Sequence, residues 1–180
     1  ALEPLVRRMI QLEPSDPANY FALAKIYEDA GAYDQGEQVL QRAKVARPND
    51  PAVYLQLAGY YNRQGQFDKT IQALEERAAK EPNNPEASYT IATYYWDKSY
   101  RDARLTDNDK KAYVQKGIEA IDHALQIKPD YMEALIYKNL LLRLQANMVK
   151  DLATQQALIK QADQLRNKAQ DLRKQKTSGD

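Results

Sequence analysis

Residues 17–50 read PANYFALAKIYEDAGAYDQGEQVLQRAKVARPND, and residues 51–84 read PAVYLQLAGYYNRQGQFDKTIQALEERAAKEPNN. The two stretches are each 34 residues long, and they align without a gap, so that Tyr20 matches Tyr54. Two series of prolines share this period: Pro14, Pro48 and Pro82, and Pro17, Pro51 and Pro85. A fixed period of this length indicates a solenoid built from stacked units.

Each unit predicts a helix, a tight turn and a second helix. In the first unit, Tyr20, Leu23, Ala24 and Tyr27 are spaced 3, 1 and 3 residues apart, which places them on one face of a helix. Gly31 interrupts this pattern, and a second apolar series follows at Gly36, Val39, Leu40 and Ala43. The next unit repeats both series at Tyr54, Leu57, Ala58 and Tyr61, and at Thr70, Ile71, Leu74 and Ala78. Proline ends the second helix because it lacks the N–H that would continue it.

This pattern resembles the tetratricopeptide repeat over nearly the whole chain. The resemblance implies an all-α fold, a right-handed α-α superhelix of antiparallel helix hairpins with a long C-terminal helix. One solenoid is expected over residues 1–176, followed by a polar tail at 177–180. Its parts are a half repeat at 1–16, repeats at 17–50, 51–84 and 85–131, and a degenerate repeat with a C-terminal capping helix at 132–176.

The third repeat contains an insertion of about 13 residues near 99–111. The insertion is expected in the turn between the two helices of the hairpin. Thr106 is followed three residues later by Asp109, and this pair resembles a capping box. The second helix is therefore predicted to begin early and to run from about Asp107 to Ile127.

The two ends of the chain depart from the repeat. Residues 1–13 resemble the second helix of a repeat without its first helix, with an apolar stripe at Leu2, Leu5, Val6, Met9 and Ile10. Near the other end, Leu158, Leu165 and Leu172 lie on a narrow heptad seam. This seam either lays a capping helix on the last repeat or forms a docking strip for another chain.

Composition excludes several classes of function. The formal net charge is only +1, which is too small to attract nucleic acid or an anionic membrane. No apolar run approaches the length of a membrane span. The chain has no cysteine and one histidine, His123, and it lacks phosphate loops and nucleophile elbows. We therefore expect no catalytic residues, no metal site and no cofactor, and the predicted partner is a protein.

The resemblance also implies where a partner binds, because the first helix of each repeat lines the concave face of the superhelix. The residues expected to face this groove are Phe21, Lys25, Glu28, Leu55, Asn62, Arg63, Tyr89, Thr93, Trp96, Ile136, Leu140 and Arg143. Tyr94, Tyr95, Trp96 and Tyr100 form the densest aromatic cluster. They either pack the inserted loop or anchor a partner, since Trp and Tyr dominate binding energy at interfaces.

Two functions are compatible with these patterns. The first is a non-catalytic protein-protein interaction scaffold that binds a partner segment in the concave groove. The alternative is a structural subunit that assembles head to tail into an oligomer or filament, with end contacts through the N-terminal stripe and the heptad seam. The stretches YYWDKSYRDARL (94–105) and ALIYKNLLLRLQA (134–146) are similar to those of bacterial repeat proteins in exported settings, which favours the cell envelope or the extracellular space over the cytoplasm.

Overall fold

The computed structural model describes residues 2–179, and every regular element in this range is an α-helix. The helices are α1 (Leu2–Leu12), α2 (Pro17–Asp29), α3 (Tyr33–Ala46), α4 (Pro51–Arg63), α5 (Phe67–Lys80), α6 (Pro85–Arg101), α7 (Asp107–Ile127), α8 (Met132–Met148) and α9 (Leu152–Ser178). The all-α prediction is confirmed. None of these helices combines the length and apolarity that a membrane crossing requires.

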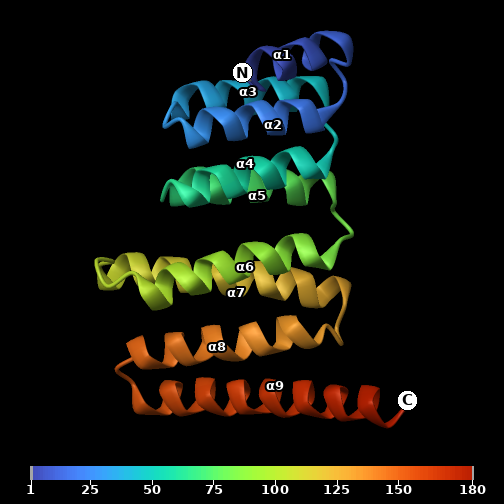
Figure 1. Cartoon of the computed structure of the whole chain (residues 1–180). Helices are drawn as coiled ribbons and strands as arrows, with labels where there is room; N and C mark the ends of the chain where they lie inside the picture. The colour runs from blue at the N-terminus through green and yellow to red at the C-terminus, as the bar shows by residue number, and fades with distance from the viewer. Residues whose placement is uncertain (1, 180) are drawn as a thin grey trace. The chain divides into compact units, whose positions relative to one another are not determined.

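The described residues form two compact units, divided between Pro82 and Asn83. In the first unit, α2 pairs with α3 and α4 pairs with α5 as antiparallel hairpins, and α1 packs against α2 (Figure 1). In the second unit, α6 pairs with α7 and α8 pairs with α9, while α8 also contacts both helices of the preceding hairpin (Figure 1). In each unit, the first hairpin thus also contacts the helix that follows it, α4 or α8.

Helix starts follow a repeated local rule. The side chains of Asp16, Asp50 and Asn84 each accept a hydrogen bond, 3.0 Å long, from the backbone N–H two residues later. In each case a proline occupies the first turn of the helix, where its missing N–H is not needed. The Asx-Pro pairs at 34-residue intervals thus set where α2, α4 and α6 begin.

The turns inside the first two hairpins depend on glycine. Gly31 and Gly65 have φ angles of 73° and 70°, a left-handed conformation that other residues adopt only with strain. The turn then closes with a hydrogen bond from Ala32 N–H to the Tyr27 carbonyl (2.8 Å) and with its equivalent from Gln66 to Tyr61 (3.0 Å). The turns at these glycines lie where the repeat pattern predicted the break between the two helices of each hairpin.

The insertion in the third repeat mainly lengthens helices. α6 has 17 residues and α7 has 21, whereas α2 and α4 have 13 and α3 and α5 have 14. Only residues 102–106 lie between α6 and α7. The predicted start of α7 at Asp107 is confirmed, and the Thr106 hydroxyl oxygen accepts a hydrogen bond from Asp109 N–H at 3.1 Å. The expectation that the extra residues sit in the turn is therefore corrected, because most of them add turns to the two helices.

Helix α8 is buried on several sides. Its buried residues include Ala134, Leu135, Leu141 and Leu142, and two of these join the core of the second unit with Val114 and Ile121. α9 packs along α8 and continues to Ser178, two residues into the segment expected to be a polar tail. This arrangement places the long polar helix α9 over the apolar helix that precedes it.

Candidate interaction surfaces

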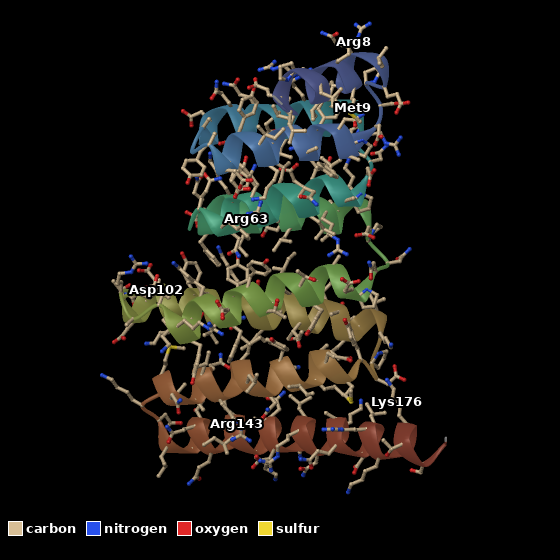
Figure 2. The ribbon with its side chains drawn as sticks, viewed as in Figure 1. Arg8, Met9, Arg63, Asp102, Arg143 and Lys176 are labelled. Carbon is tan, nitrogen blue, oxygen red and sulfur yellow. The ribbon has the colours of Figure 1, made fainter. Side chains whose placement is uncertain are left out.

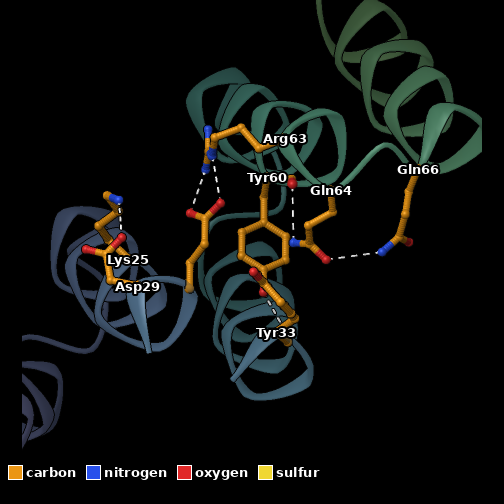
Figure 3. Close-up of polar contacts among 8 residues, drawn as sticks. Lys25, Asp29, Tyr33, Tyr60, Arg63, Gln64 and Gln66 are labelled. Atoms are coloured by element: carbon orange, nitrogen blue, oxygen red, sulfur yellow. Dashed lines mark hydrogen bonds and ion pairs between the residues drawn. The ribbon is translucent and has the colours of Figure 1, made fainter. Parts of the chain in front are cut away.

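The first helices of the hairpins in the first unit, α2 and α4, carry six of the predicted groove residues. Lys25, Leu55 and Asn62 are exposed, and Phe21 is partly buried. Arg63 on α4 donates two hydrogen bonds to the Glu28 carboxylate on α2, at 2.7 and 3.0 Å (Figure 3). The bidentate pair holds these two helices side by side, and it raises the pKa of Arg63.

Lys25 also has an acidic partner, since its ammonium group forms an ion pair with Asp29 one turn later on α2 (Figure 3). Charges predicted to line the groove are therefore largely neutralised within this unit. What this surface still offers to a partner is the exposed side chain of Leu55, together with polar Asn62.

In the second unit, α6, α8 and the residue just before α8 carry a continuous row of rings, which we call the aromatic strip. It consists of Tyr131, Tyr89, Tyr137, Trp96 and Tyr100. The ring centroids of successive members lie 5.2, 5.4, 5.6 and 5.0 Å apart in that order. Trp96 and Tyr100 are stacked with an angle of 9° between their planes, whereas Tyr137 meets both Tyr89 and Trp96 edge to face. Such pairs are favourable beyond the area that they bury.

The strip is half-buried. Tyr89, Trp96, Tyr131 and Tyr137 are of intermediate exposure, and Tyr100 is 64% exposed. Burial raises the pKa of the Tyr89 hydroxyl to about 12. Four of the rings pack with one side against the hydrophobic core of the unit, which holds them in position: Tyr89, Trp96, Tyr131 and Tyr137. A rigid surface with partly exposed aromatic faces suits recognition, because little side-chain freedom is lost when a partner binds.

The remaining predicted groove residues of this unit differ in exposure and in their hydrogen-bond partners. Thr93 lies on α6 between Tyr89 and Trp96, where its hydroxyl donates to the Thr90 carbonyl at 2.7 Å. Ile136 is 40% exposed, and Leu140 is partly buried. Arg143 donates to Asp163 on α9 at 2.5 Å and to Asn139 at 2.9 Å, so it braces α8 against α9 (Figure 2).

The aromatic cluster that the sequence singled out is divided by the structure. Tyr95 is buried, and its ring packs against Tyr113 of α7 at 5.8 Å. Trp96 and Tyr100 belong to the strip instead. Sequence reasoning missed Tyr131 and Tyr137, since the register of the degenerate repeat assigned the groove positions to their neighbours. A sequence signal existed: the tyrosines of α8 and its N-terminus recur six residues apart beside an aromatic-rich first helix.

The two predicted end contacts have different exposure. On α1, Val6 and Ile10 are buried, but Leu2, Leu5 and Met9 are 66%, 58% and 43% exposed. Leu12 extends this exposed stripe, and Arg8 lies beside it (Figure 2). On α9, Leu158, Leu165 and Leu172 are half-buried, while Ala162 and Ala169 between them are fully buried on the helix that packs against α8.

Comparisons with known proteins agree with this architecture. Family models described as tetratricopeptide repeat match residues 3–59 and 51–93. A crystal structure of MamA is 18% identical, with a TM-score of 0.64 over 96% of this chain and 87% of that one. MamA from Desulfovibrio magneticus RS-1 is also 18% identical, with a TM-score of 0.56 over 94% and 82% of the two chains.

A monomeric mutant of IFIT1 with Gppp-AAAA is another similar structure. It is 18% identical, with a TM-score of 0.53 over 91% of this chain and 35% of that one. At these identities the likeness concerns the fold alone. No curated protein matches the sequence.

Proposed function

Because the chain belongs to the tetratricopeptide-repeat family, we propose that it is a non-catalytic scaffold that holds a segment of another protein against its first-helix surfaces. Membership of this family supports a role in protein interaction. The finer proposal, a bound segment on α6 and α8, rests on one observation: five aromatic side chains form a continuous, half-exposed strip there. Rigid Trp and Tyr side chains of this kind are the usual anchors of protein interfaces.

The pairing of the positive charges on the first helices favours a protein partner over a polyanion. Lys25 and Arg63 are paired with carboxylates, and so is Arg143. The chain as a whole has a net charge of +1. Nucleic-acid binding depends on unpaired positive charge that neutralises phosphates. We therefore propose a partner with an uncharged contact segment.

The proposal is tested with a Tyr89→Ala/Trp96→Ala double variant, used as bait beside the unaltered chain in extracts of its native cell. The matched control is Tyr33→Ala, which removes a 49% exposed tyrosine from α3. We expect the double variant to lose specific partners that both the unaltered chain and the control retain. Equal capture by all three folded baits would exclude the strip as the binding surface.

A second candidate function is self-assembly through the end of the first unit. It is supported by the exposed stripe on α1, whose four large apolar side chains recur at spacings of 3, 4 and 3 residues. Exposed apolar stripes on surface helices usually mark contacts with another chain. The partner face of such a contact stays a proposal, as does the part that Leu158, Leu165 and Leu172 were expected to play.

A further inference from the structure

The hydroxyl groups of the aromatic strip distinguish it from the buried tyrosines of the first unit. In the first unit, Tyr20 and Tyr54 donate to the carbonyls of Pro14 and Pro48, at 2.8 and 2.5 Å. Tyr61 donates to Glu37 at 2.8 Å. Tyr27 and Tyr60 are likewise satisfied, by Glu3 and by the Tyr33 carbonyl. The buried tyrosines of the first unit thus have partners for their hydroxyls on a neighbouring helix or on the loop beside it.

The strip tyrosines make no such bonds. Within residues 2–179, the hydroxyls of Tyr89, Tyr131 and Tyr137 have no hydrogen-bond partner in the protein, although all three side chains are half-buried. Their rings are held by neighbouring rings, and Lys128 lies over the ring of Tyr131 at 5.3 Å from its centroid. The strip therefore presents flat apolar faces together with hydroxyl donors that are free to bind an acceptor.

These two properties discriminate between kinds of bound segment. A helix has its backbone carbonyls paired internally, so it would cover the hydroxyls without satisfying them, and this costs free energy. A β-strand exposes N–H donors as well as carbonyls along its edge, and most of these N–H groups would be covered by the apolar rings of the strip without finding an acceptor. A polyproline II segment lacks N–H groups at its prolines and leaves its carbonyls free, while its rings offer flat apolar faces.

We propose that the aromatic strip binds a proline-rich segment of a partner protein in the polyproline II conformation. Its proline rings pack on Trp96 and the tyrosine rings, and its carbonyls accept hydrogen bonds from the free tyrosine hydroxyls. Neighbouring ring centroids are 5.0–5.6 Å apart and a polyproline II chain rises about 3.1 Å per residue, so the segment would meet a new ring roughly every two residues. The preformed conformation of such a segment also reduces the entropy lost on binding.

This inference rests on the proposed function, and it names the partner chemistry of the same surface. Charged groups lie near the Tyr131 end of the strip, where Lys128 covers the ring, but the stretch from Tyr89 to Trp96 is uncharged. Thr93, the residue between Tyr89 and Trp96 on α6, is uncharged, and the neighbouring Asp97 is paired with Arg101 at 2.6 Å. A segment that lies along this stretch of α6 needs no charged side chain, which matches a run of prolines.

The test uses the one tryptophan of the chain, Trp96, as an internal reporter within the strip. Decaproline is titrated into the full chain while tryptophan fluorescence is recorded, and isothermal calorimetry detects binding that leaves fluorescence unchanged. We expect a saturable signal. The Tyr89→Phe/Tyr137→Phe variant keeps both rings and removes both hydroxyls, so it is expected to bind about tenfold more weakly. Tyr33→Phe, the matched control outside the strip, is expected to bind as the unaltered chain does.

Three results would contradict the inference. Absence of saturable decaproline binding in both measurements overturns it, as does equal affinity of the unaltered chain and the double Phe variant. Preferential binding of a leucine-rich amphipathic helical peptide, lost in Tyr89→Ala/Trp96→Ala, also overturns it but leaves the proposed function intact. Circular dichroism and thermal unfolding of each variant ensure that a loss of binding is not a loss of fold.

Discussion

Gly36 shows how closely single atoms determine packing in the first unit. A Cβ at this position would lie 2.5 Å from the Tyr60 hydroxyl and 3.1 Å from its ring. Tyr60 is 1% exposed, and its hydroxyl is held by the Tyr33 carbonyl, so the ring has no room to move. The glycine is therefore needed for the close approach of α3 and α4.

We expect Gly36→Ala to lower the free energy of unfolding by about 1–3 kcal/mol, because the added methyl group displaces Tyr60. Gly59→Ala is the matched control, since its Cβ would meet only the flexible end of Arg63 at 3.2 Å. That variant should be neutral or more stable by up to about 1 kcal/mol, as alanine favours the helix. Urea denaturation of both variants measures the difference, and equal effects would refute the explanation.

The buried hydroxyl of Ser99 leads to a second prediction about stability. It is 1% exposed, and its hydroxyl has no hydrogen-bond partner among the described residues. Ser99→Ala removes a buried unpaired group, so stability should be unchanged or rise by about 1 kcal/mol. Thr70→Val provides the contrast, because the Thr70 hydroxyl donates to the Gln66 carbonyl at 2.8 Å and its loss should destabilise. A clear loss of stability in Ser99→Ala would contradict this view.

Tyr61 predicts how stability depends on alkaline pH. Burial, helped by its hydrogen bond to Glu37, raises the pKa of the Tyr61 hydroxyl from 10.0 to about 12. Between these values the unfolded chain loses the proton while the folded chain retains it, so stability falls as pH rises from about 10 to 12. Tyr61→Phe should be less stable at pH 7 by about 1 kcal/mol but should lose less stability over the alkaline range. Identical pH slopes for the two proteins would be inconsistent with a raised pKa.

At the scale of helices, α9 provides the clearest test of how the second unit is completed. Ala162 is fully buried on the helix that packs against α8, whereas Ala157 on the same helix is exposed. Ala162→Glu places a charge in a buried position and should cost about 3 kcal/mol. Ala157→Glu should have little effect. Thermal unfolding compares the two, and similar melting temperatures would mean that α9 does not cap the unit.

The elements were more predictable than the site. The proline series, Gly31 and the Thr106 cap are local signals that the sequence analysis used, and helix boundaries lie beside them; the Asx caps before Pro17, Pro51 and Pro85 are equally local but were recognised only in the structure. The strip was only half predicted. Tyr89 and Trp96 follow from the 34-residue register, but Tyr137 does not, since its position depends on how α8 packs beside α6. Likewise, no spacing rule reveals that Arg63 pairs with Glu28, because the two residues lie 35 positions apart.

At the scale of the whole molecule, the exposed stripe of α1 predicts how the chain behaves at high concentration. Leu5→Glu places a charge at the centre of this stripe, and Arg8→Glu changes a charge beside it. If the stripe mediates self-assembly, the molar mass of the unaltered protein rises above the monomer value of 20.6 kDa as its concentration increases. Size-exclusion chromatography with light scattering measures this mass. Leu5→Glu then remains monomeric, while Arg8→Glu still assembles. A constant monomer mass for the unaltered chain would exclude this second function.

The central claim, that a partner segment lies along the α6 surface, is tested most directly by site-specific photo-crosslinking in native cells or their extract. A benzophenone amino acid replaces Thr93, between Tyr89 and Trp96, and in a control it replaces Glu119, an exposed residue of α7. The account predicts discrete crosslinked partners from position 93, with contact peptides identifiable by mass spectrometry, and none of these from position 119. Identical patterns from both positions, or none from position 93, would contradict it.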